Sequence, residues 1–310
     1  MKSLIIYHRA DYDGLFSMMI SRMWLERNSE PGDEVDLFGW NYGDKIPDMT
    51  YDIGQKYDRV VMVDISFPTE QMLELMSFMK VGVEVIWIDH HITAINDSIT
   101  NGYSGISGLR DSEWAATENT WHYFFPSTPT PHIVKLISTY DIFDRRRFDW
   151  ENEVLPLQFA LKAKYSLYAD RLWKDWPWMI TAEPIDLVPI IESGKLILEY
   201  LSGTWASTMK NFSWEVTVGG KYRGIACIST EFSSNVFGDL KDKYDVLVVC
   251  NWRPKNEWFS VSMYIDPEVE TDFHAGNYLR ENYGGGGHKG AAGGHINQDQ
   301  FLRLINDHEI

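Results

Sequence analysis

SLIIYHRADYDG, residues 3–14, decides how the chain begins to fold. Its first five residues are a continuous apolar run, which is typical of a strand buried on both faces. The remainder places His8, Asp11 and Asp13 within six residues, and Gly14 then lets the chain turn at once into a helix. One carboxylate after a strand is ordinary, because it often caps the next helix. A histidine and two carboxylates together indicate a binding site.

Strand and helix patterns alternate through the first half of the chain. The apolar runs are continuous, which indicates a parallel sheet covered by helices on both faces. We predict strands at 3–8, 35–40, 59–66 and 83–91, and helices at 14–28, 69–80, 115–125 and 131–144. The first half is therefore expected to be an α/β domain.

The pattern changes near residue 213. A Gly219-Gly220 pair between two strand-like runs predicts a hairpin over 214–230. A short helix at 234–244, strands at 244–252 and 258–266 and a helix at 274–283 follow, and the chain then reaches GGGGHKGAAGG. We predict a catalytic domain at 1–184, a helical linker at 185–212 and a smaller α/β domain at 213–310.

Charge and composition exclude several classes of protein. The net charge of −17, from 45 acidic and 28 basic residues, disfavours a protein that binds long nucleic acid through clustered Lys and Arg. The negative charge does not exclude a small anionic substrate if bound cations reverse the local electric field at the binding site. Cys227 and Cys250 lie in separate apolar runs and are expected to be reduced core residues.

The apolar runs are strand-sized, so no membrane association is expected. The N-terminus reaches acidic residues before a signal-peptide core could form, which favours a cytoplasmic location.

Predicted strand ends carry the same kind of side chain three times. His8, Asp11 and Asp13 follow the first strand, Asp64 follows VVMV, and Asp89, His90 and His91 follow VIWI. The carboxyl ends of parallel strands line the crevice where ligands bind, so these groups can converge. Asp141, in STYDIFD, ends a helical segment that could lean over the same edge.

Imidazole and carboxylate groups without cysteine suit a divalent ion such as Mn²⁺ better than Zn²⁺. Four carboxylates and two histidines exceed the needs of one ion and match two ions about 3.5–4 Å apart, which can clamp a phosphoryl group. Asp64, alone between two clusters, is the natural bridging ligand. The ordinary alternative for an isolated aspartate at a strand end is a helix cap.

Four segments, HRADYDGLFS, VVMVDIS, VIWIDHH and YDIFD, resemble in order and spacing the motifs of the DHH phosphoesterases. GGGGHKGAAGG is similar to the signature of their associated C-terminal domain, so the resemblance covers nearly the whole chain. The family includes RecJ exonucleases, nano-RNases, cyclic-dinucleotide phosphodiesterases and manganese pyrophosphatases. The segment from Ser112 to Asp141 is similar to the oligoribonuclease and cyclic-nucleotide phosphodiesterase subgroup.

The resemblance implies a role for each matching residue. His8 and Asp11 would hold one ion, Asp13, His90 and Asp141 the other, and Asp64 would bridge them. Asp89 would orient His90 or lie beside the metals, and His91 would face the phosphate. Two points stay open: His8 precedes Asp11 by three residues where several branches have four, and Asp144 competes with Asp141 for the last ligand position.

The glycine-rich segment would bind the terminal phosphate or nucleotide of the substrate, across a cleft between the two domains. The residues concerned are Gly285, Gly286, Gly287, His288 and Lys289. A run of glycines can expose backbone N–H groups to an anion, and the alternative is a flexible linker. Two further segments have open roles: RRR at 145–147 is a solvated helix end or a phosphate contact, and WKDWPW at 173–178 is aromatic packing or a stacking surface for bases.

These features predict a phosphodiesterase with two divalent ions, Mn²⁺ first with Mg²⁺ or Co²⁺ as alternatives. It would hydrolyse short oligonucleotides or small nucleotides through a metal-bridging hydroxide. A RecJ-like single-strand exonuclease is disfavoured by the charge, and a pyrophosphatase or polyphosphatase by the GGGH segment. A nucleotide-binding regulator is disfavoured because every expected ligand position is filled. Stable binding to long nucleic acid is not expected, and the oligomeric state stays open, a homodimer included.

Overall fold

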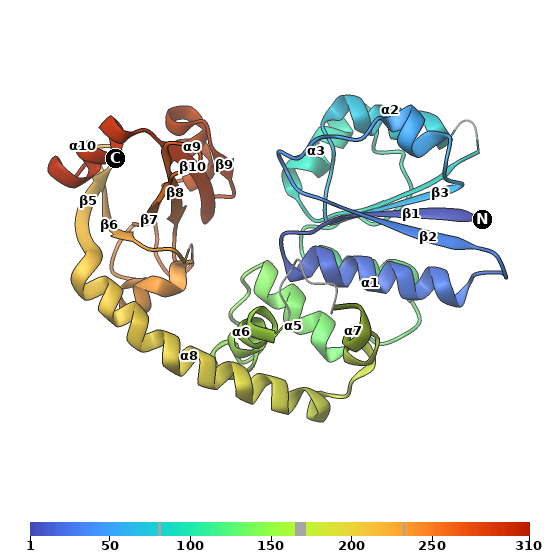
Figure 1. Cartoon of the computed structure of the whole chain (residues 1–310), viewed down its shortest axis with the longest axis horizontal. Helices are drawn as coiled ribbons and strands as arrows, with labels where there is room; N and C mark the ends of the chain where they lie inside the picture. Colours follow the sequence, from blue (N-terminus) through green and yellow to red (C-terminus); the bar gives the residue numbers. More distant parts are fainter. Residues whose placement is uncertain (80–81, 165–171, 232) are drawn as a thin grey trace. The chain divides into compact units, whose positions relative to one another are not determined.

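The computed structural model describes residues 1–79, 82–164, 172–231 and 233–310 (Figure 1). The chain forms two compact units, Met1–Ile197 and Leu198–Ile310. Helix α8 (Pro184–Phe212) runs from the first unit into the second. The predicted linker at 185–212 lies within this helix, while the predicted domain limits stay a prediction.

The first unit is built on a four-stranded parallel sheet. Its strands lie in the order β2-β1-β3-β4, with bounds β1 (Lys2–His8), β2 (Glu34–Trp40), β3 (Arg59–Val63) and β4 (Glu84–Ile88). Helix α1 (Tyr12–Arg27) covers one face, and α2 (Thr69–Met79) and α3 (Ile92–Asn101) lie on the other (Figure 1). The predicted parallel sheet with helices on both faces is confirmed.

Continuous apolar runs explain why most side chains of β1, β3 and β4 are buried. Ile5, Val61 and Trp87 are fully buried, and burying a large apolar side chain stabilises the fold by roughly 1.5–3 kcal/mol. β2 carries charged residues and forms an edge of the sheet, where its side chains are half-buried. Helix α3 was not predicted.

The rest of the first unit is helical. α4 (Ala116–Phe124) and α5 (His132–Asp141) pack against α1, and match the helices predicted at 115–125 and 131–144. The remaining elements are the short π-helical turns η1 (Met49–Gly54) and η2 (Trp150–Val154), with α6 (Leu155–Lys164) and α7 (Leu172–Thr181). Most of the WKDWPW side chains, those of residues 173–176, lie outside the described side chains, as does their suggested stacking role.

The second unit is a six-stranded mixed sheet in the order β5-β6-β7-β8-β10-β9. The strands are β5 (Ser213–Val218), β6 (Tyr222–Ile228), β7 (Val246–Arg253), β8 (Trp258–Tyr264), β9 (Gly286–Gly287) and β10 (Ala291–Ile296). Among the described strands of this sheet, only β6 and β7 pair in parallel. Gly219 and Gly220 close the predicted hairpin with positive φ angles of 59° and 66°.

Both faces of this sheet are covered. α9 (Ala275–Tyr283) and α10 (Gln298–Asn306) contribute Leu279 and Phe301 to one core. The 3₁₀ segment η3 (Ser234–Leu240), which breaks at Gly238, packs with the end of α8 on the other face. Cys227 and Cys250 are buried and free, as predicted. The predicted fold class, an α/β N-terminal domain followed by a smaller α/β domain, is confirmed.

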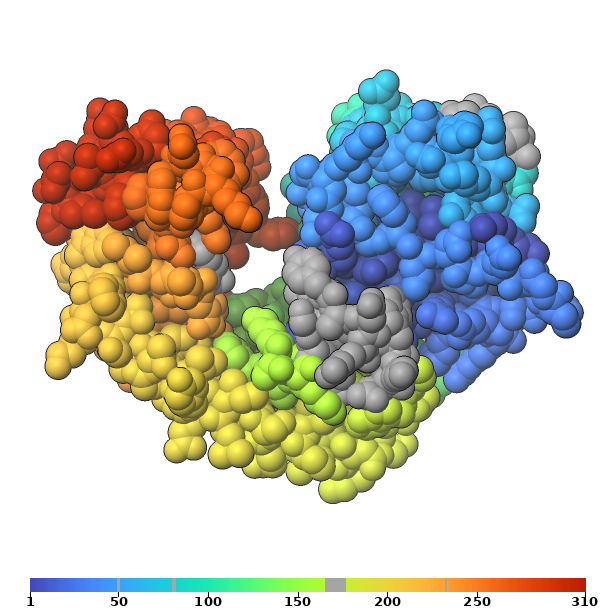
Figure 2. All heavy atoms as spheres, in the orientation of Figure 1, coloured from blue at the N-terminus to red at the C-terminus, as the bar shows by residue number. Residues whose placement is uncertain are grey.

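Helix α8 is long enough to cross a bilayer, since about 20 residues suffice, but it carries Asp186, Glu192, Lys195 and Glu199 along its length. Figure 2 shows one long side of this helix, coloured yellow, open to solvent. Among the described residues, we find no helix with an apolar stretch that could span a membrane.

Candidate metal centre

The predicted site residues meet at the carboxyl edge of the parallel sheet. His8 is the last residue of β1, and Asp64 and Asp89 directly follow β3 and β4. The strand register pairs Tyr7 with Val63 and Val63 with Ile88, so the three strand ends lie side by side. β1 has β2 on one side and β3 on the other. Such a reversal of strand order opens a crevice for a ligand.

Asp11 links the strand end to the start of α1. One carboxylate oxygen caps the helix by accepting from the Gly14 amide at 2.9 Å, and the other lies 2.9 Å from His8 Nδ1. The helix can begin this close to β1 only because residue 14 is glycine: a Cβ there would lie 2.0 Å from the His8 carbonyl oxygen. Asp11 can therefore cap the helix with one carboxylate oxygen and bind a metal ion with the other.

His8, Asp11 and Asp64 form one group of potential ligands. His8 Nδ1 lies 3.4 Å from Asp64 Oδ2, and Asp64 is 1% exposed. Neither Asp64 oxygen nor His8 Nδ1 has an aligned hydrogen-bond partner among the described residues. Buried carboxylates are nearly always hydrogen-bonded or bound to a cation. These orphaned atoms therefore fit a metal ion.

The backbone at Asp64 supports a functional role. Its φ is 58°, in the left-handed region that few residues other than glycine adopt, although aspartate and asparagine tolerate it. Backbone conformations of this kind cluster at functional sites. Here the turn aims the carboxylate at the histidines.

Asp13, His90 and Asp141 form a second group. His90 Nε2 lies 3.3 Å from Asp141 Oδ2, 3.4 Å from Asp64 Oδ1 and 3.9 Å from Asp13 Oδ2. Asp64 therefore faces both groups, with one oxygen toward His8 and the other toward His90. In each group the potential ligand atoms lie within 4.8 Å of one another.

Asp13 has a structural role as well. Its two carboxylate oxygens accept from the backbone amides of Ala116 and Thr117, at 2.9 and 2.8 Å, and so cap the start of α4. Each carboxylate oxygen has a second lone pair, so this cap leaves room for a cation. The contact ties the second ligand group to a helix more than 100 residues along the chain.

The buried carboxylates and histidines shift one another's pKa values. Burial raises the pKa of Asp141 to about 7, with the charges of Asp11 and Asp64 adding to the effect. Burial, then Asp64 and Asp141, also raise the pKa of Asp13. Burial lowers the pKa of His8 and of His90, but the neighbouring carboxylates outweigh it and raise these values to about 11 and about 9. Such a surplus of buried negative charge favours divalent cations.

The Asp89 carboxylate contacts the ring of His91 rather than the ring of His90. Its Oδ1 accepts from the His90 and His91 amides at 2.8 and 3.2 Å and lies 2.7 Å from His91 Nδ1. We expected Asp89 to orient His90 or to lie beside the metals. In the structure its carboxylate contacts the ring of His91, which precedes α3, and its role at the metals stays a prediction. A carboxylate on one ring nitrogen directs the other nitrogen toward its target.

The structure brings Asp141, and not Asp144, to His90. Asp141 is the last residue of α5. Asp144 lies beyond the helix, where its Oδ1 accepts from the Arg146 amide at 3.1 Å.

No family model matches the chain. A curated relative, the uncharacterized protein R106 of Acanthamoeba polyphaga mimivirus, is 23% identical over 247 residues, or 76% of this chain and 52% of the relative. The chain therefore spans about half the length of the curated relative it matches.

Three solved structures are similar to nearly the whole chain. The DHH domain of a member of a ribosomal protein family is 14% identical, with a TM-score of 0.62 over 98% of this chain and 84% of that one. The pGpG-specific phosphodiesterase PggH of Vibrio cholerae is 13% identical, with a TM-score of 0.56 over 99% of this chain and 97% of that one. RecJ of Thermus thermophilus in complex with Mn²⁺ is 15% identical, with a TM-score of 0.52 over 98% of this chain and 51% of that one.

The chain has the DHH-domain fold. The fold that the resemblance of the four motifs implies is thus confirmed, whereas the activity and the subgroup stay predictions. The Vibrio cholerae protein is by name a phosphodiesterase, and RecJ of Thermus thermophilus was solved with Mn²⁺.

The glycine-rich segment is not a linker. Gly286 and Gly287 form β9 and pair with β10, and a Cβ on Gly285 would lie 2.2 Å from the Gly293 carbonyl oxygen. The first amides of α9 donate to the carbonyls of His288 and Lys289, at 3.0 Å each. Close packing thus explains the glycines. The side chains of His288 and Lys289 are exposed, and their role in substrate binding stays a prediction.

Two of the three arginines at 145–147 make contacts with other side chains of the first unit. Arg147 forms a two-pronged ion pair with buried Glu118, at 2.6 and 2.7 Å, and lies 4.4 Å over the Trp114 ring. Arg145 lies over the rings of Phe143 and Trp150. Only Arg146 of the three is exposed.

Removing the Arg147 partner of Glu118 is expected to destabilise the protein. Arg147→Ala removes both short hydrogen bonds to the buried Glu118 carboxylate and leaves it, among the described residues, only His122, at 4.0 Å, which costs roughly 3–5 kcal/mol. Arg146→Ala, its neighbour at an exposed position, should change stability by about 0.5 kcal/mol or less. Urea unfolding of the two variants measures the difference, and equal midpoints would refute the structural role of Arg147.

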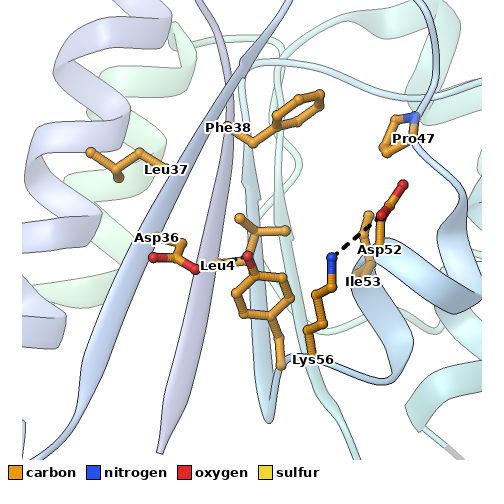
Figure 3. A pocket seen from close by; sticks show the side chains of 9 residues that line it. Leu4, Asp36, Leu37, Phe38, Pro47, Asp52, Ile53 and Lys56 are labelled. Carbon is orange, nitrogen blue, oxygen red and sulfur yellow. Dashed lines mark hydrogen bonds and ion pairs between the residues drawn. The ribbon is translucent and has the colours of Figure 1, made fainter.

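A hollow of about 420 Å³ lies beside β2, apart from the metal centre (Figure 3). Its lining residues include none of the predicted ligands. Its polar groups pair among themselves: Tyr57 donates to Asp36 at 2.9 Å, and Lys56 lies 3.4 Å from Asp52. We assign it no role in the site.

Sequence reasoning missed Tyr42. Its ring centroid lies 5.9 Å from that of His8 and 6.4 Å from that of His91. The signal was present, because NYGD follows β2 at the same sheet edge where the acidic residues follow β1, β3 and β4.

Proposed function

We propose that this protein is a phosphodiesterase that uses two divalent metal ions, Mn²⁺ first, to hydrolyse short oligonucleotides or small nucleotides. The supporting observation is the buried cluster at the sheet edge, where both Asp64 oxygens and His8 Nδ1 lack an aligned hydrogen-bond partner within the described part of the chain. The DHH-domain fold, shared with a phosphodiesterase and a manganese-bound RecJ, adds to it.

Two sets of residues would hold the ions. His8 and Asp11 would bind one ion and Asp13, His90 and Asp141 the other, with Asp64 between them because its two oxygens face the two sets. When bound, divalent cations supply a hydroxide nucleophile near neutral pH and offset the charge of the phosphate. The cluster of carboxylates positions the cations and thereby makes an acidic site accept an anion.

His91 would contact the phosphate. Without bound cations, burial lowers its pKa, but Asp89 and then Asp64 and Asp141 raise it to about 9, so in that state the ring holds two protons near pH 7. Bound cations would lower this pKa, and the Asp89 carboxylate would counteract them. Since Nδ1 faces Asp89, the proton on Nε2 is the one that can be donated to a phosphate oxygen. Asp89 thus acts through His91, by fixing its orientation and its charge.

The charge of the chain favours a small substrate. A net charge of −17 gives little long-range attraction for a polyanion, and Arg145 and Arg147 are engaged within the fold. We propose that the second unit binds the far end of the substrate through Gly285, Gly286, Gly287, His288 and Lys289. We propose that the protein is located in the cytoplasm. We also propose a homodimer as one oligomeric state, which the sedimentation experiment below tests.

A hydrolysis panel tests this function. Dinucleotides, longer oligonucleotides, cyclic nucleotides and pyrophosphate are incubated with Mn²⁺ and with chelator. We expect hydrolysis of the short substrates with Mn²⁺, none with chelator, and recovery when Mn²⁺ is added back. Full activity in chelator would refute the metal mechanism. Preference for long single strands would favour the RecJ-like alternative, and phosphate release from pyrophosphate the pyrophosphatase. Sedimentation of the same sample gives the oligomeric state.

A further inference from the structure

An exposed aromatic ring stands beside the two histidines that flank Asp64. Tyr42 lies two residues beyond β2, whose last residue, Trp40, pairs with His8. The Tyr42 ring meets the rings of His8 and His91 edge-on, at interplanar angles of 66° and 78°. His8 contacts one Asp64 oxygen and His91 lies 3.9 Å from the other. Tyr42 is therefore next to the place where the phosphate would bind.

The turn that carries Tyr42 is held from several sides. The Asp44 carboxylate accepts from the Asn41 amide and from Arg9, at 3.0 Å each. The indole of buried Trp40 donates to the Lys45 carbonyl at 3.2 Å and packs against the Tyr42 ring, with centroids 5.5 Å apart. A ring placed this way needs little further ordering when a ligand binds, and such preorganisation increases affinity.

The ring is nevertheless open to solvent. Tyr42 is 55% exposed, whereas its neighbour Trp40 is 3% exposed. A single exposed aromatic side chain is ordinary on a protein surface. Here the exposure coincides with a fixed orientation and with contact to two residues of the metal centre. That combination distinguishes Tyr42 from an exposed tyrosine such as Tyr51, which is 67% exposed on η1.

We propose that Tyr42 binds the substrate by stacking on the nucleobase next to the phosphate that is cleaved. This inference rests on the proposed function and adds the chemical class that the site recognises: a phosphate that carries a base. Every base has a π-face, so stacking tolerates sequence while rejecting a phosphate without a base. The site should therefore have weak base preference and strong dependence on the presence of a base.

The first test compares substrates that differ only in a base. Tyr42→Ala should lower kcat/KM for a dinucleotide by about 5- to 150-fold, the range for loss of one base–aromatic stack. Tyr42→Phe keeps the ring and should stay close to wild type. A dinucleotide with an abasic residue in place of the stacked nucleoside should be hydrolysed equally by wild type and Tyr42→Ala. An equal loss on both substrates, or no loss on either, would overturn the inference.

A binding experiment separates this inference from the proposed function. In Mn²⁺-loaded protein, wild type should bind adenosine monophosphate more tightly than ribose 5-phosphate, and Tyr42→Ala should lose that preference while binding Mn²⁺ as wild type does. Tyr51→Ala is the matched control and should keep the preference. If wild type fails to hydrolyse any phosphodiester but this preference holds, the proposed function fails and the role of Tyr42 stands. Equal affinity of wild type for the two ligands would refute the role of Tyr42.

Discussion

Replacing Asp64 with asparagine is expected to lower metal-dependent hydrolysis by about 1,000-fold, the upper range for losing one group that stabilises the transition state directly. Asp64 is the one described carboxylate with an oxygen toward each ligand group: Oδ2 is 3.4 Å from His8 and Oδ1 is 3.4 Å from His90. An amide has no charge and offers a single oxygen, so it cannot serve both sides. Initial rates at saturating Mn²⁺ measure the effect.

Asparagine is the right substitution because it separates chemistry from folding. It matches aspartate in size and tolerates the positive φ of residue 64, which alanine does not. Asp144→Asn is the control, since Asp144 lies outside both ligand groups, and this variant should retain its activity. If Asp64→Asn keeps more than a tenth of the wild-type rate, Asp64 does not lie between two ions.

The parallel sheet and its acidic edge could be predicted because both follow from short-range patterns. Continuous apolar runs in β1, β3 and β4 predict buried strands, and helices between them predict parallel pairing. Parallel strands bring their carboxyl ends to one edge, so His8, Asp64 and Asp89 converge although they are far apart in sequence. The parallel topology alone was enough to predict that these side chains lie close together.

Helix α3 could not be predicted in the same way. Its sequence, ITAINDSITN, is rich in β-branched residues and asparagine, which have modest helix propensity. Ala94 and Ser98 are buried, so packing stabilises the helix where propensity does not. Because His91 precedes this helix, the direction of its ring depends on the packing too. The pairing of Asp89 with His91 was therefore hidden from sequence reasoning.

The glycine-rich segment shows a second limit. Gly285 lies against Gly293, and Gly276, in α9, lies against Gly287, where a Cβ would be 2.1 Å from the carbonyl oxygen. A run of glycines indicates close approach of the backbone to something, and the sequence does not tell whether that partner is a ligand or another strand. In this protein the described contacts are with β10 and α9.

Binding of Mn²⁺ is expected to release protons and to become tighter as the pH rises. In the metal-free protein burial lowers the pKa of His8 and His90, yet the carboxylates around them raise it to about 11 and about 9, so both rings are charged at pH 7. A metal ligand must be neutral imidazole, so each ion has to displace a proton. Affinity should then rise about tenfold per pH unit for each proton displaced, up to about pH 9 for the His90 proton and about pH 11 for the His8 proton.

The sign of the stability change follows from the same shifts. Because the folded pKa values are raised above about 6.5, charged His8 and His90 stabilise the metal-free protein fully below that pH. This contribution is lost as the pH rises through about 9 for His90 and through about 11 for His8. Added Mn²⁺ should therefore raise the melting temperature more at pH 8 than at pH 6. Calorimetric titration in buffers of different protonation enthalpy counts the protons, and His90→Gln should release one fewer than wild type. Equal apparent enthalpies in all buffers, with an affinity that does not change between pH 6 and 8, would show that these histidines do not bind the metal.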